Sequence, residues 1–251
     1  MVNGKSNKEV YKLIDKAKLD VVSKPIAESH GLPNECYTSQ EYTKIERKKL
    51  FEDKWIVIGA ASSLPNKGDA KPFNLLDLPI IILRDKKNKI RVFHNVCSHR
   101  GYKILQKTCS IKNTLRCPYH SWSYNTDGKL VATPHIGGMN KHTVKDFNKS
   151  ESGLKEIRST VWLDLIMINI SNNEIPFEKY IKPLSDRWSK FWPEKDRKLI
   201  SHSNDFGYFQ LRANCNWKFA IENYCESYHL PWVHPGLNSY SKIEDHYHIQ
   251  G

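Results

Sequence analysis

Two short segments carry cysteine and histidine at spacings that could hold a metal. The first is Cys97-Ser-His99, with one residue between the potential ligands, and the second is Cys117-Pro-Tyr-His120, with two. Thiolates and imidazoles are ligands that proteins use both for zinc and for iron–sulfur clusters. The four side chains could bind one zinc ion tetrahedrally. Alternatively, both cysteines could hold one iron of a [2Fe-2S] cluster and both histidines the other.

The distribution of these ligands favours the iron–sulfur cluster. Zinc ribbons usually place two cysteines in one turn and the remaining ligand pair in another. Here each segment supplies one cysteine and one histidine, so two matching loops could each send one ligand to each iron. This is the ligand arrangement of a Rieske cluster. A structural zinc protein without a redox role is the alternative.

A second candidate site lies near the end of the chain. An amphipathic helix is predicted over residues 217–228, and Glu222, Glu226 and His229 stand at i, i+4 and i+7 along its polar stripe. A polar stripe is usually just solvated, but this one ends in a histidine and His234 follows five residues later. Two imidazoles near a carboxylate are the start of a 2-His-1-carboxylate site for Fe(II).

Taken together, these motifs resemble the large catalytic subunits of the Rieske non-haem iron oxygenases. The matching stretches are Cys97-x-His99-Arg-Gly, Cys117-Pro-Tyr-His120-x-Trp-x-Tyr, Asn216-Trp-Lys and Glu222-Asn-Tyr-Cys-Glu226-Ser-Tyr-His229, continuing to His234-Pro-Gly. The resemblance extends from about Leu32 to the last residue. It implies a [2Fe-2S] cluster on Cys97, His99, Cys117 and His120, and a mononuclear Fe(II) on His229 and His234.

The resemblance also implies roles for Glu226 and Asn223, which we take as candidate catalytic residues. In the family, the acidic residue at the position of Glu226 bridges to a cluster histidine of a neighbouring subunit in a homotrimer. Most aromatic-ring oxygenases have aspartate there. Glutamate followed by x-Tyr-His resembles instead the branch that acts on quaternary ammonium compounds such as carnitine and betaines.

The third iron ligand of the family is an aspartate that is expected beyond Gly251. The resemblance therefore implies that these residues correspond to the front part of a catalytic subunit. By themselves they are expected to bind the cluster, to hold the mononuclear iron poorly and to be inactive as an enzyme.

The function implied is that of a terminal oxygenase component, a mono- or dioxygenase that hydroxylates a small organic substrate with O₂. No G-x-G-x-x-G stretch occurs, so electrons from NAD(P)H are expected to arrive through a separate reductase or ferredoxin. One alternative within the family is an aromatic-ring hydroxylating dioxygenase. A second alternative is a Rieske electron carrier with no oxygenase activity.

The expected fold class is α+β. A small all-β Rieske domain over residues 41–155 is followed by the first part of a helix-grip, START-like catalytic domain over residues 156–251, and residues 1–40 form a segment that packs on the catalytic domain. Within this scheme, strands are predicted at 55–60, 79–83, 90–94, 114–116, 121–124, 129–132, 160–170 and 206–213, and helices at 38–51 and 181–192. Thr38 and Glu41 suggest a capping box.

Composition restricts the other possibilities. The chain of 251 residues has no apolar run of membrane-spanning length and no signal peptide, which predicts a cytoplasmic protein that does not bind membranes. The cysteines outside the cluster motifs are expected to be free thiols: Cys36, Cys109, Cys215 and Cys225.

The net charge of +12 raises the question of nucleic-acid binding. The lysines are spread along the whole chain without a nucleic-acid-binding motif, so we expect no nucleic acid and a lysine-rich solvated surface. A docking surface for an acidic electron-donor protein is the weaker alternative.

Overall fold

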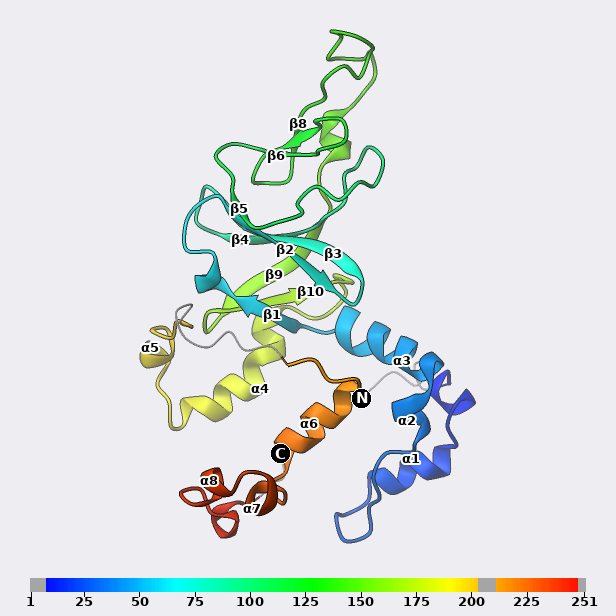
Figure 1. Ribbon diagram of the computed structural model, residues 1–251, viewed down its shortest axis with the longest axis vertical. Helices are drawn as coiled ribbons and strands as arrows, with labels where there is room; N and C mark the ends of the chain where they lie inside the picture. The colour runs from blue at the N-terminus through cyan, green and yellow to red at the C-terminus, as the bar shows by residue number, and fades with distance from the viewer. Residues whose placement is uncertain (1–7, 203–210, 248–251) are drawn as a thin grey trace. The chain divides into compact units, whose positions relative to one another are not determined.

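The computed structural model describes residues 8–202 and 211–247. The chain divides into two compact units, one comprising Met1–Ile45 with Phe209–Gly251 and the other Glu46–Tyr208 (Figure 1). The strands belong to the second unit, and the first unit is helical. Across the described ranges, no helix is both long and apolar enough to cross a membrane.

The β unit is built on a seven-stranded antiparallel sheet with the strand order β1-β10-β9-β4-β3-β2-β5. A smaller antiparallel sheet has the order β6-β7-β8 and lies at one end of this unit (Figure 1). The strands are β1 Ile56–Ala60, β2 Asp69–Leu75, β3 Leu78–Arg84, β4 Ile90–His94, β5 Cys109–Ser110, β6 Leu115–Arg116, β7 Ser123–Tyr124, β8 Leu130–Ala132, β9 Glu156–Trp162 and β10 Leu165–Asn169.

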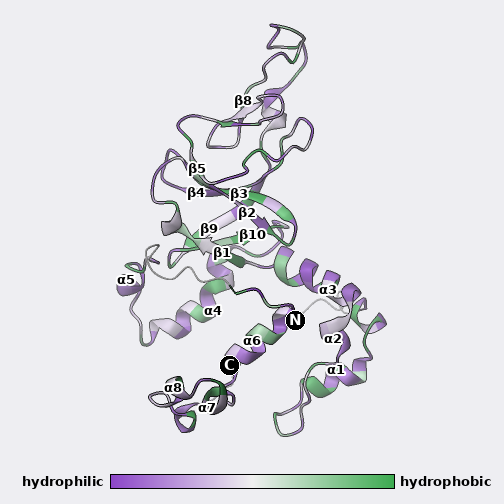
Figure 2. Cartoon of the chain, viewed as in Figure 1, coloured by the Kyte–Doolittle hydropathy of each residue, from purple (hydrophilic) through white to green (hydrophobic). Residues whose placement is uncertain are grey.

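The large sheet separates two hydrophobic cores, and strand β3 contributes to both. Because successive side chains of a strand point to opposite faces, Ile80 and Ile82 enter one core while Ile81 and Leu83 enter the other. The second of these cores also contains the two candidate ligand cysteines. The apolar residues gather in the strands of this sheet (Figure 2). The face of the sheet that carries Ile81 and Leu83 therefore packs against the two Cys–His segments, which we call the cluster loops.

Most predicted strands are confirmed, with one error in the later part. The strands at 79–83 and 90–94 pair as an antiparallel hairpin, with Ile80 opposite His94. The predicted single strand at 160–170 is wrong, because Leu163 and Asp164 adopt positive φ values of 52° and 64° and turn the chain between β9 and β10. Because the flanking residues are apolar, the sequence pattern does not reveal this tight turn.

Two further expectations concern the later part of the chain, the end of the Rieske domain at residue 155 and the strand at 206–213. Strand β9 pairs with β4, so the sheet continues past residue 155, where the Rieske domain was expected to end. Of the strand predicted at 206–213, residues 206–210 lie outside the described ranges and residues 211–213 have no strand structure.

A helical segment leads into the first strand. Helix α3 Gln40–Glu46 continues as a π-helical turn, Arg47–Glu52, which confirms the helix predicted at 38–51. The expected capping box at Thr38 is wrong by one residue. The Ser39 hydroxyl accepts the Tyr42 N–H at 3.2 Å. Thr38 is instead the last residue of α2, and its hydroxyl donates to the Asn34 carbonyl.

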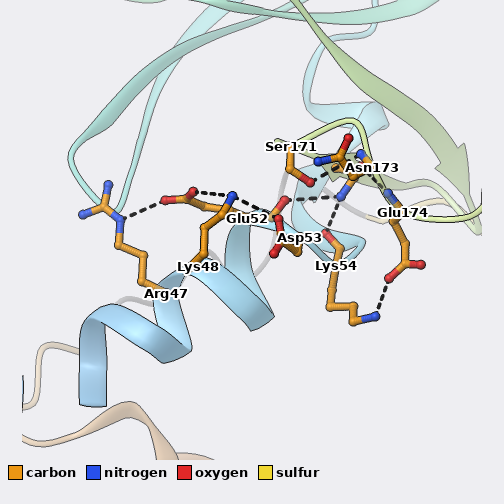
Figure 3. Close-up of polar contacts among 9 residues, drawn as sticks. Arg47, Lys48, Glu52, Asp53, Lys54, Ser171, Asn173 and Glu174 are labelled. Atoms are coloured by element: carbon orange, nitrogen blue, oxygen red, sulfur yellow. Dashed lines mark hydrogen bonds and ion pairs between the residues drawn. The ribbon is translucent and has the colours of Figure 1, made fainter. Parts of the chain in front are cut away.

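Ion pairs hold the π-helical turn and the entry to β1 in place (Figure 3). Arg47 pairs with Glu52 at 3.4 Å, and Lys48 pairs with Asp53 at 3.1 Å. Lys54 Nζ lies 2.6 Å from Glu174 Oε2, which ties the start of β1 to the loop after β10.

The remaining helices are short. In the β unit, α4 Phe177–Ser189 covers most of the helix predicted at 181–192, and α5 Glu194–Arg197 follows. The helical unit contains α1 Lys16–Val22, α2 Glu35–Thr38, α6 Trp217–Cys225, α7 Leu230–Val233 and α8 Pro235–Asn238. Within the described ranges, all six cysteines are free thiols.

Candidate functional site

The two Cys–His segments fold into loops with the same hydrogen-bond pattern. In the first loop, the Cys97 N–H donates to the Tyr102 carbonyl at 2.9 Å and the Gly101 N–H donates to the Cys97 carbonyl at 2.9 Å. In the second, the Cys117 N–H donates to the Trp122 carbonyl at 2.8 Å and the Ser121 N–H donates to the Cys117 carbonyl at 3.0 Å. Each loop is therefore closed five residues after its cysteine.

In both loops, the residue at the same position has a left-handed backbone conformation. Gly101 has a φ of +69° and Ser121 a φ of +58°, four residues after Cys97 and Cys117 respectively. Glycine adopts this conformation without penalty, whereas serine is strained there. The matching conformations bring the loops together as two similar halves of one site.

The structure brings the four predicted ligands to this site. The rings of His99 and His120 lie 4.7 Å apart, centroid to centroid, and both side chains are exposed. Cys97 and Cys117 are buried, with exposed fractions of 2% and 1%. The donor set is thus divided into two inner thiols and two outer imidazoles, as a [2Fe-2S] cluster with one iron on each pair requires.

Burial shifts the pKa of one ligand in each loop. Burial, followed by the neighbouring Cys97 thiol, raises the pKa of Cys117. Burial, followed by the proximity of His120 and Arg100, lowers the pKa of His99. A thiol loses its proton when it binds a metal, and an imidazole ligates through a ring-nitrogen lone pair. The residues present therefore fit the cluster.

Aromatic side chains support the two histidines. The indole of Trp122 stacks on His99 at 4.7 Å with an angle of 14° between the planes, and the ring of Tyr119 lies 3.9 Å from that of His120. The Tyr124 hydroxyl lies 3.2 Å from Cys97 Sγ and accepts the Ser98 N–H at 3.1 Å. Burial and the contact with Cys97 raise the pKa of Tyr124, so it remains a neutral hydrogen-bond donor.

Asn95 fixes the exit of the first loop, and sequence reasoning missed it. Its fully buried side chain accepts the N–H groups of Ile104 and Leu105 at 2.9 Å each and donates to the Leu105 carbonyl at 2.7 Å. The only sequence signal is a single asparagine between a strand and a metal-ligand motif.

The second candidate site forms around α7. His229 precedes this helix and His234 follows it, and their rings lie 5.3 Å apart at an angle of 76°. Glu226 Oε1 lies 2.5 Å from His229 Nδ1, and Glu226 Oε2 accepts the His229 N–H at 3.2 Å. The carboxylate thus orients the imidazole with its Nε2 directed away from this contact.

The backbone that creates this arrangement differs from the prediction. The helix predicted at 217–228 ends at Cys225, and Glu226 is extended, with φ −121° and ψ 153°. Glu226 and His229 therefore do not belong to one helical stripe. Their pairing comes from a turn after α6, in which the side chain of Glu226 reaches the residue three positions later.

A cavity of about 530 Å³ adjoins the two histidines. Asn223 lines it together with Glu226, and the part of the chain just before residue 248 contributes His246 and Tyr247. In the ranges that the structure describes, no three His, Cys, Asp or Glu side chains form a set that could hold one metal ion. The site therefore consists of two neighbouring histidines with a carboxylate hydrogen-bonded to one of them.

Sequence reasoning also missed Tyr37, which anchors the N-terminal segment to α6. Asn216 caps α6 through its Oδ1, which accepts the Lys218 N–H at 3.1 Å, and its Nδ2 donates to the Tyr37 carbonyl at 3.0 Å. The Tyr37 ring stacks on Phe219 at 4.7 Å. No pattern around Tyr37 in the sequence indicates this packing.

Comparisons with known proteins match the segments that contain the two candidate sites. Residues 54–147 match the model of the Rieske [2Fe-2S] domain, and residues 201–251 match the model of the ring hydroxylating alpha subunit catalytic domain. The carnitine monooxygenase oxygenase subunit of Escherichia coli (strain K12) is 28% identical over 222 residues, covering 88% of this chain and 56% of that protein. The glycine betaine monooxygenase oxygenase subunit of Chromohalobacter salexigens is 30% identical over 218 residues, covering 86% of this chain and 46% of that protein.

Solved structures show the same relationship. The crystal structure of the quaternary ammonium Rieske monooxygenase CntA in complex with the substrate gamma-butyrobetaine superposes with a TM-score of 0.69 at 27% identity, covering 81% of this chain and 56% of that one. The chain thus spans about half the length of the relatives it matches. The chain thus carries a Rieske [2Fe-2S] domain followed by sequence of the ring hydroxylating alpha subunit catalytic domain, and it is similar to the oxygenase subunits of quaternary ammonium monooxygenases.

Proposed function

We propose that the chain serves the O₂-dependent hydroxylation of a small organic substrate. In this proposal, Cys97, His99, Cys117 and His120 hold a [2Fe-2S] cluster, and His229 and His234 hold a mononuclear Fe(II). When bound, the cluster supplies single electrons and the Fe(II) supplies the site at which O₂ is activated.

In the first site, the surrounding residues orient the four ligands and shield the two cysteines from solvent. Closed backbone loops fix the two cysteines inside the core, which keeps water from the sulfur atoms. Trp122 and Tyr119 hold the planes of the two exposed imidazoles. The Tyr124 hydroxyl lies 3.2 Å from Cys97 Sγ, and it would donate a hydrogen bond to this sulfur when Cys97 is bound as a thiolate, which can only accept.

In the second site, Glu226 determines which ring nitrogen of His229 can bind a metal. The Nδ1–H of the neutral ring donates to the carboxylate, so the lone pair on Nε2 is free for a metal. We further propose that Glu226 carries the family's bridging role toward a cluster histidine of a neighbouring subunit in a homotrimer. Asn223, on the wall of the same cavity, is the candidate for a polar contact to substrate or O₂.

The observation that carries the proposal is the pairing of His229 and His234 at 5.3 Å, beside Glu226, in a chain that also contains the Cys–His loops. A Rieske electron carrier needs only the loops. A second pair of histidines with a carboxylate orienting one of them is what a mononuclear iron centre requires.

For the substrate we propose a quaternary ammonium compound. The support is that the curated relatives named above are monooxygenases of carnitine and glycine betaine. The resemblance of the sequence around Glu226 to that branch adds to it. An aromatic-ring substrate is the second candidate. For the electron source, we propose a separate NAD(P)H-dependent reductase or ferredoxin.

The test combines spectroscopy with a single turnover. Anaerobically purified chain reconstituted with iron and sulfide should show the optical and electron paramagnetic resonance spectra of a Rieske cluster, and Cys117→Ser should abolish them. Cys109→Ser is the matched control, because Cys109 is an exposed thiol outside the loops. A colourless protein that binds one zinc would overturn the assignment.

For turnover, the full natural chain loaded with cluster and Fe(II) is reduced and mixed with ¹⁸O₂ and either glycine betaine, gamma-butyrobetaine or naphthalene. Product that contains ¹⁸O with the ammonium substrates is expected, and its loss in His234→Ala would assign the chemistry to the second site. Product from naphthalene alone would replace the ammonium assignment. If the cluster spectrum is normal but none of the three substrates gives product, the result would support the electron-carrier function instead.

A further inference from the structure

The side chain of Arg197, the last residue of α5, is buried but only partly paired. It is 5% exposed. Its Nη1 donates to the carbonyl and to the hydroxyl oxygen of Ser185, each at 3.3 Å, and these are its only hydrogen bonds to residues that the structure describes. Its Nε is the only buried side-chain nitrogen or oxygen without a hydrogen-bond partner in residues 8–202 and 211–247. One edge of the guanidinium, formed by Nε and Nη2, therefore has no acceptor there.

Such an unpaired guanidinium is unfavourable in a protein interior. An arginine side chain keeps its charge in proteins, and burial removes the water that would solvate this charge. Within the same ranges, no carboxylate forms an ion pair with Arg197. Buried polar groups nearly always have a partner, so an open donor edge on a buried arginine indicates a place for an anion.

Arg197 lines a cavity of about 370 Å³, which is within the size range of pockets that hold small organic ligands. The cavity lies between the turn that follows β9 and the two helices α4 and α5. These helices are at the end of the β unit that is away from the β6-β7-β8 sheet (Figure 1). Apolar surface in the cavity comes from Trp162 and Ile200, among others.

The other charged residues that line the cavity already have partners. Lys198 Nζ lies 2.8 Å from Glu194 Oε1. The carboxylate of Asp164 accepts the His202 N–H at 2.7 Å. Arg197 is thus the cation of the lining that lacks a counter-charge, and it matches a ligand with a single negative charge. The two carboxylates would repel a dianion more strongly than a monoanion.

The open edge of the guanidinium and the aromatic wall both suit a flat organic acid. Nε and Nη2 lie on the same side of the guanidinium and can donate two parallel hydrogen bonds to the two oxygens of a carboxylate. The indole of Trp162 is held by stacking on Trp188, with ring centroids 5.5 Å apart. A fixed aromatic side chain packs well against a planar apolar group.

We propose that this cavity binds a small organic monocarboxylate. The carboxylate accepts hydrogen bonds from Nε and Nη2 of Arg197, and the apolar body of the ligand lies against Trp162 and Ile200. No covalent bond is made or broken.

The proposed ligand site is distinct from the cluster loops. Strand β9 pairs with β4, which leads into the first loop, through Glu156 and Ile157 at its start, whereas the cavity adjoins Trp162 at its other end. The proposal therefore goes beyond the proposed function and does not depend on it.

The experiment uses benzoate as the probe, because benzoate combines one carboxylate with a flat apolar body. Calorimetric titration of the full chain should show saturable binding of one benzoate at millimolar concentrations. Benzamide has nearly the same shape but no charge, and it should bind about tenfold more weakly or worse. Absence of saturable benzoate binding would overturn the proposal. Tighter binding of inorganic phosphate than of benzoate would overturn the carboxylate assignment.

Substitutions localise the binding to the cavity. Arg197→Lys keeps the positive charge but loses the paired donors, so benzoate should bind about tenfold more weakly or worse. Ile200→Trp fills the cavity while leaving Arg197 in place, and it should also abolish binding. The matched control is Arg187→Lys, at an exposed arginine of α4, which should bind benzoate as the wild type does. Unchanged affinity in Arg197→Lys or in Ile200→Trp would overturn the proposal.

Two further measurements keep the test valid if a variant folds poorly. In a ¹⁵N nuclear magnetic resonance spectrum of the wild-type chain, the Nε–H signal of Arg197, identified by its absence in Arg197→Lys, should move as benzoate is added. An unmoved signal would overturn the proposal. Benzoate should also raise the Tm of the wild type but not that of Arg197→Met. An equal rise in both proteins would show that Arg197 has only a structural role, which also overturns the proposal.

Discussion

The phenolic oxygen of Tyr37 lies 2.6 Å from Oε1 of Glu222, although 185 positions separate the two residues in the chain. Glu222 is on α6, the helix that ends immediately before Glu226. The N-terminal segment is thus attached to the helix that leads into the second candidate site.

Removing the Tyr37 hydroxyl should weaken this attachment. Tyr37→Phe keeps the ring that stacks on Phe219 but loses the hydrogen bond, so the free energy of unfolding should fall by about 1 kcal/mol. Denaturant unfolding of the variant measures this change. Tyr240→Phe, at an exposed tyrosine of the same unit, should have no effect, and an equal loss in both variants would contradict the role of Tyr37.

The same contact predicts a dependence on pH. The hydrogen bond to Glu222 and burial raise the pKa of Tyr37 to about 12. Since the pKa is higher in the folded state, the contribution to stability is fully present below about pH 10, the value for unfolded tyrosine, and is lost as the pH rises through about 12. Ultraviolet titration should show a late-ionising tyrosine that is absent in Tyr37→Phe.

Lys218 should stabilise the helical unit through its charge. Its side chain is only 7% exposed, and Nζ lies 5.3 to 5.5 Å from the ring centroids of Tyr37, Tyr42 and Trp217. Lys218→Met should lower the free energy of unfolding by about 1–2 kcal/mol, and Lys218→Arg should restore part of it. Lys242→Met serves as the exposed control in the same chemical unfolding experiment. Equal stability of the Met and Arg variants would show that the charge is unimportant.

Tyr124 should raise the reduction potential of the cluster. Its hydroxyl contacts Cys97 Sγ, and a donor to a ligand sulfur favours the reduced state. Tyr124→Phe should lower the potential by roughly 60 mV, the one-electron equivalent of a hydrogen bond worth about 1.4 kcal/mol. Protein-film voltammetry measures the shift. Tyr102→Phe, which changes an exposed phenol next to the first loop, should leave the potential unchanged.

Glu226 should determine the affinity of the second site for metal. Glu226→Gln weakens the acceptor for His229 Nδ1–H, so Fe(II) or Co(II) should bind about 10- to 100-fold more weakly. Anaerobic calorimetry with the purified chain tests this. Glu244→Gln, an exposed carboxylate of the same unit, is the control, and an equal loss there would indicate only a general effect of charge.

The loop residues with positive φ should respond in opposite directions to substitution. Gly101→Ala should destabilise the protein by about 1–2 kcal/mol, and this loss comes from the backbone alone because no atom lies within 4 Å of the added Cβ. Ser121→Gly should recover a similar free energy by relieving the strained serine. Thermal unfolding of the cluster-loaded protein measures both, and a loss of stability in Ser121→Gly would contradict the explanation.

Sequence reasoning selected Cys97, His99, Cys117 and His120 because the type and spacing of potential ligands can be read directly from the sequence. Cysteine and histidine are rare, and a repeated Cys–His pairing at short intervals has few structural explanations. The same reasoning could not find Asn95, whose role comes from burial of one amide against the backbone ten residues later. Nor could it find Tyr37, which depends on a contact between distant parts of the chain.

Periodicity failed where a local interaction overrides it. Glu226 and His229 fit a helical stripe in the sequence, yet the carboxylate takes the His229 N–H and the chain leaves the helix at Cys225. Similarly, the run at 160–170 is apolar enough for one strand, and the turn at Leu163 and Asp164 is visible only in the backbone angles. In both places the predicted backbone was wrong.

The paired closure of the two cluster loops limits how the chain can vary. Each cysteine carbonyl accepts the amide four residues on, and each cysteine amide donates to the carbonyl five residues on. An insertion or deletion between Cys97 and Tyr102, or between Cys117 and Trp122, would break both bonds of that loop, whereas exchanging an exposed side chain within it would break neither. Length, more than residue identity, is therefore the property that an engineered version of either loop has to preserve.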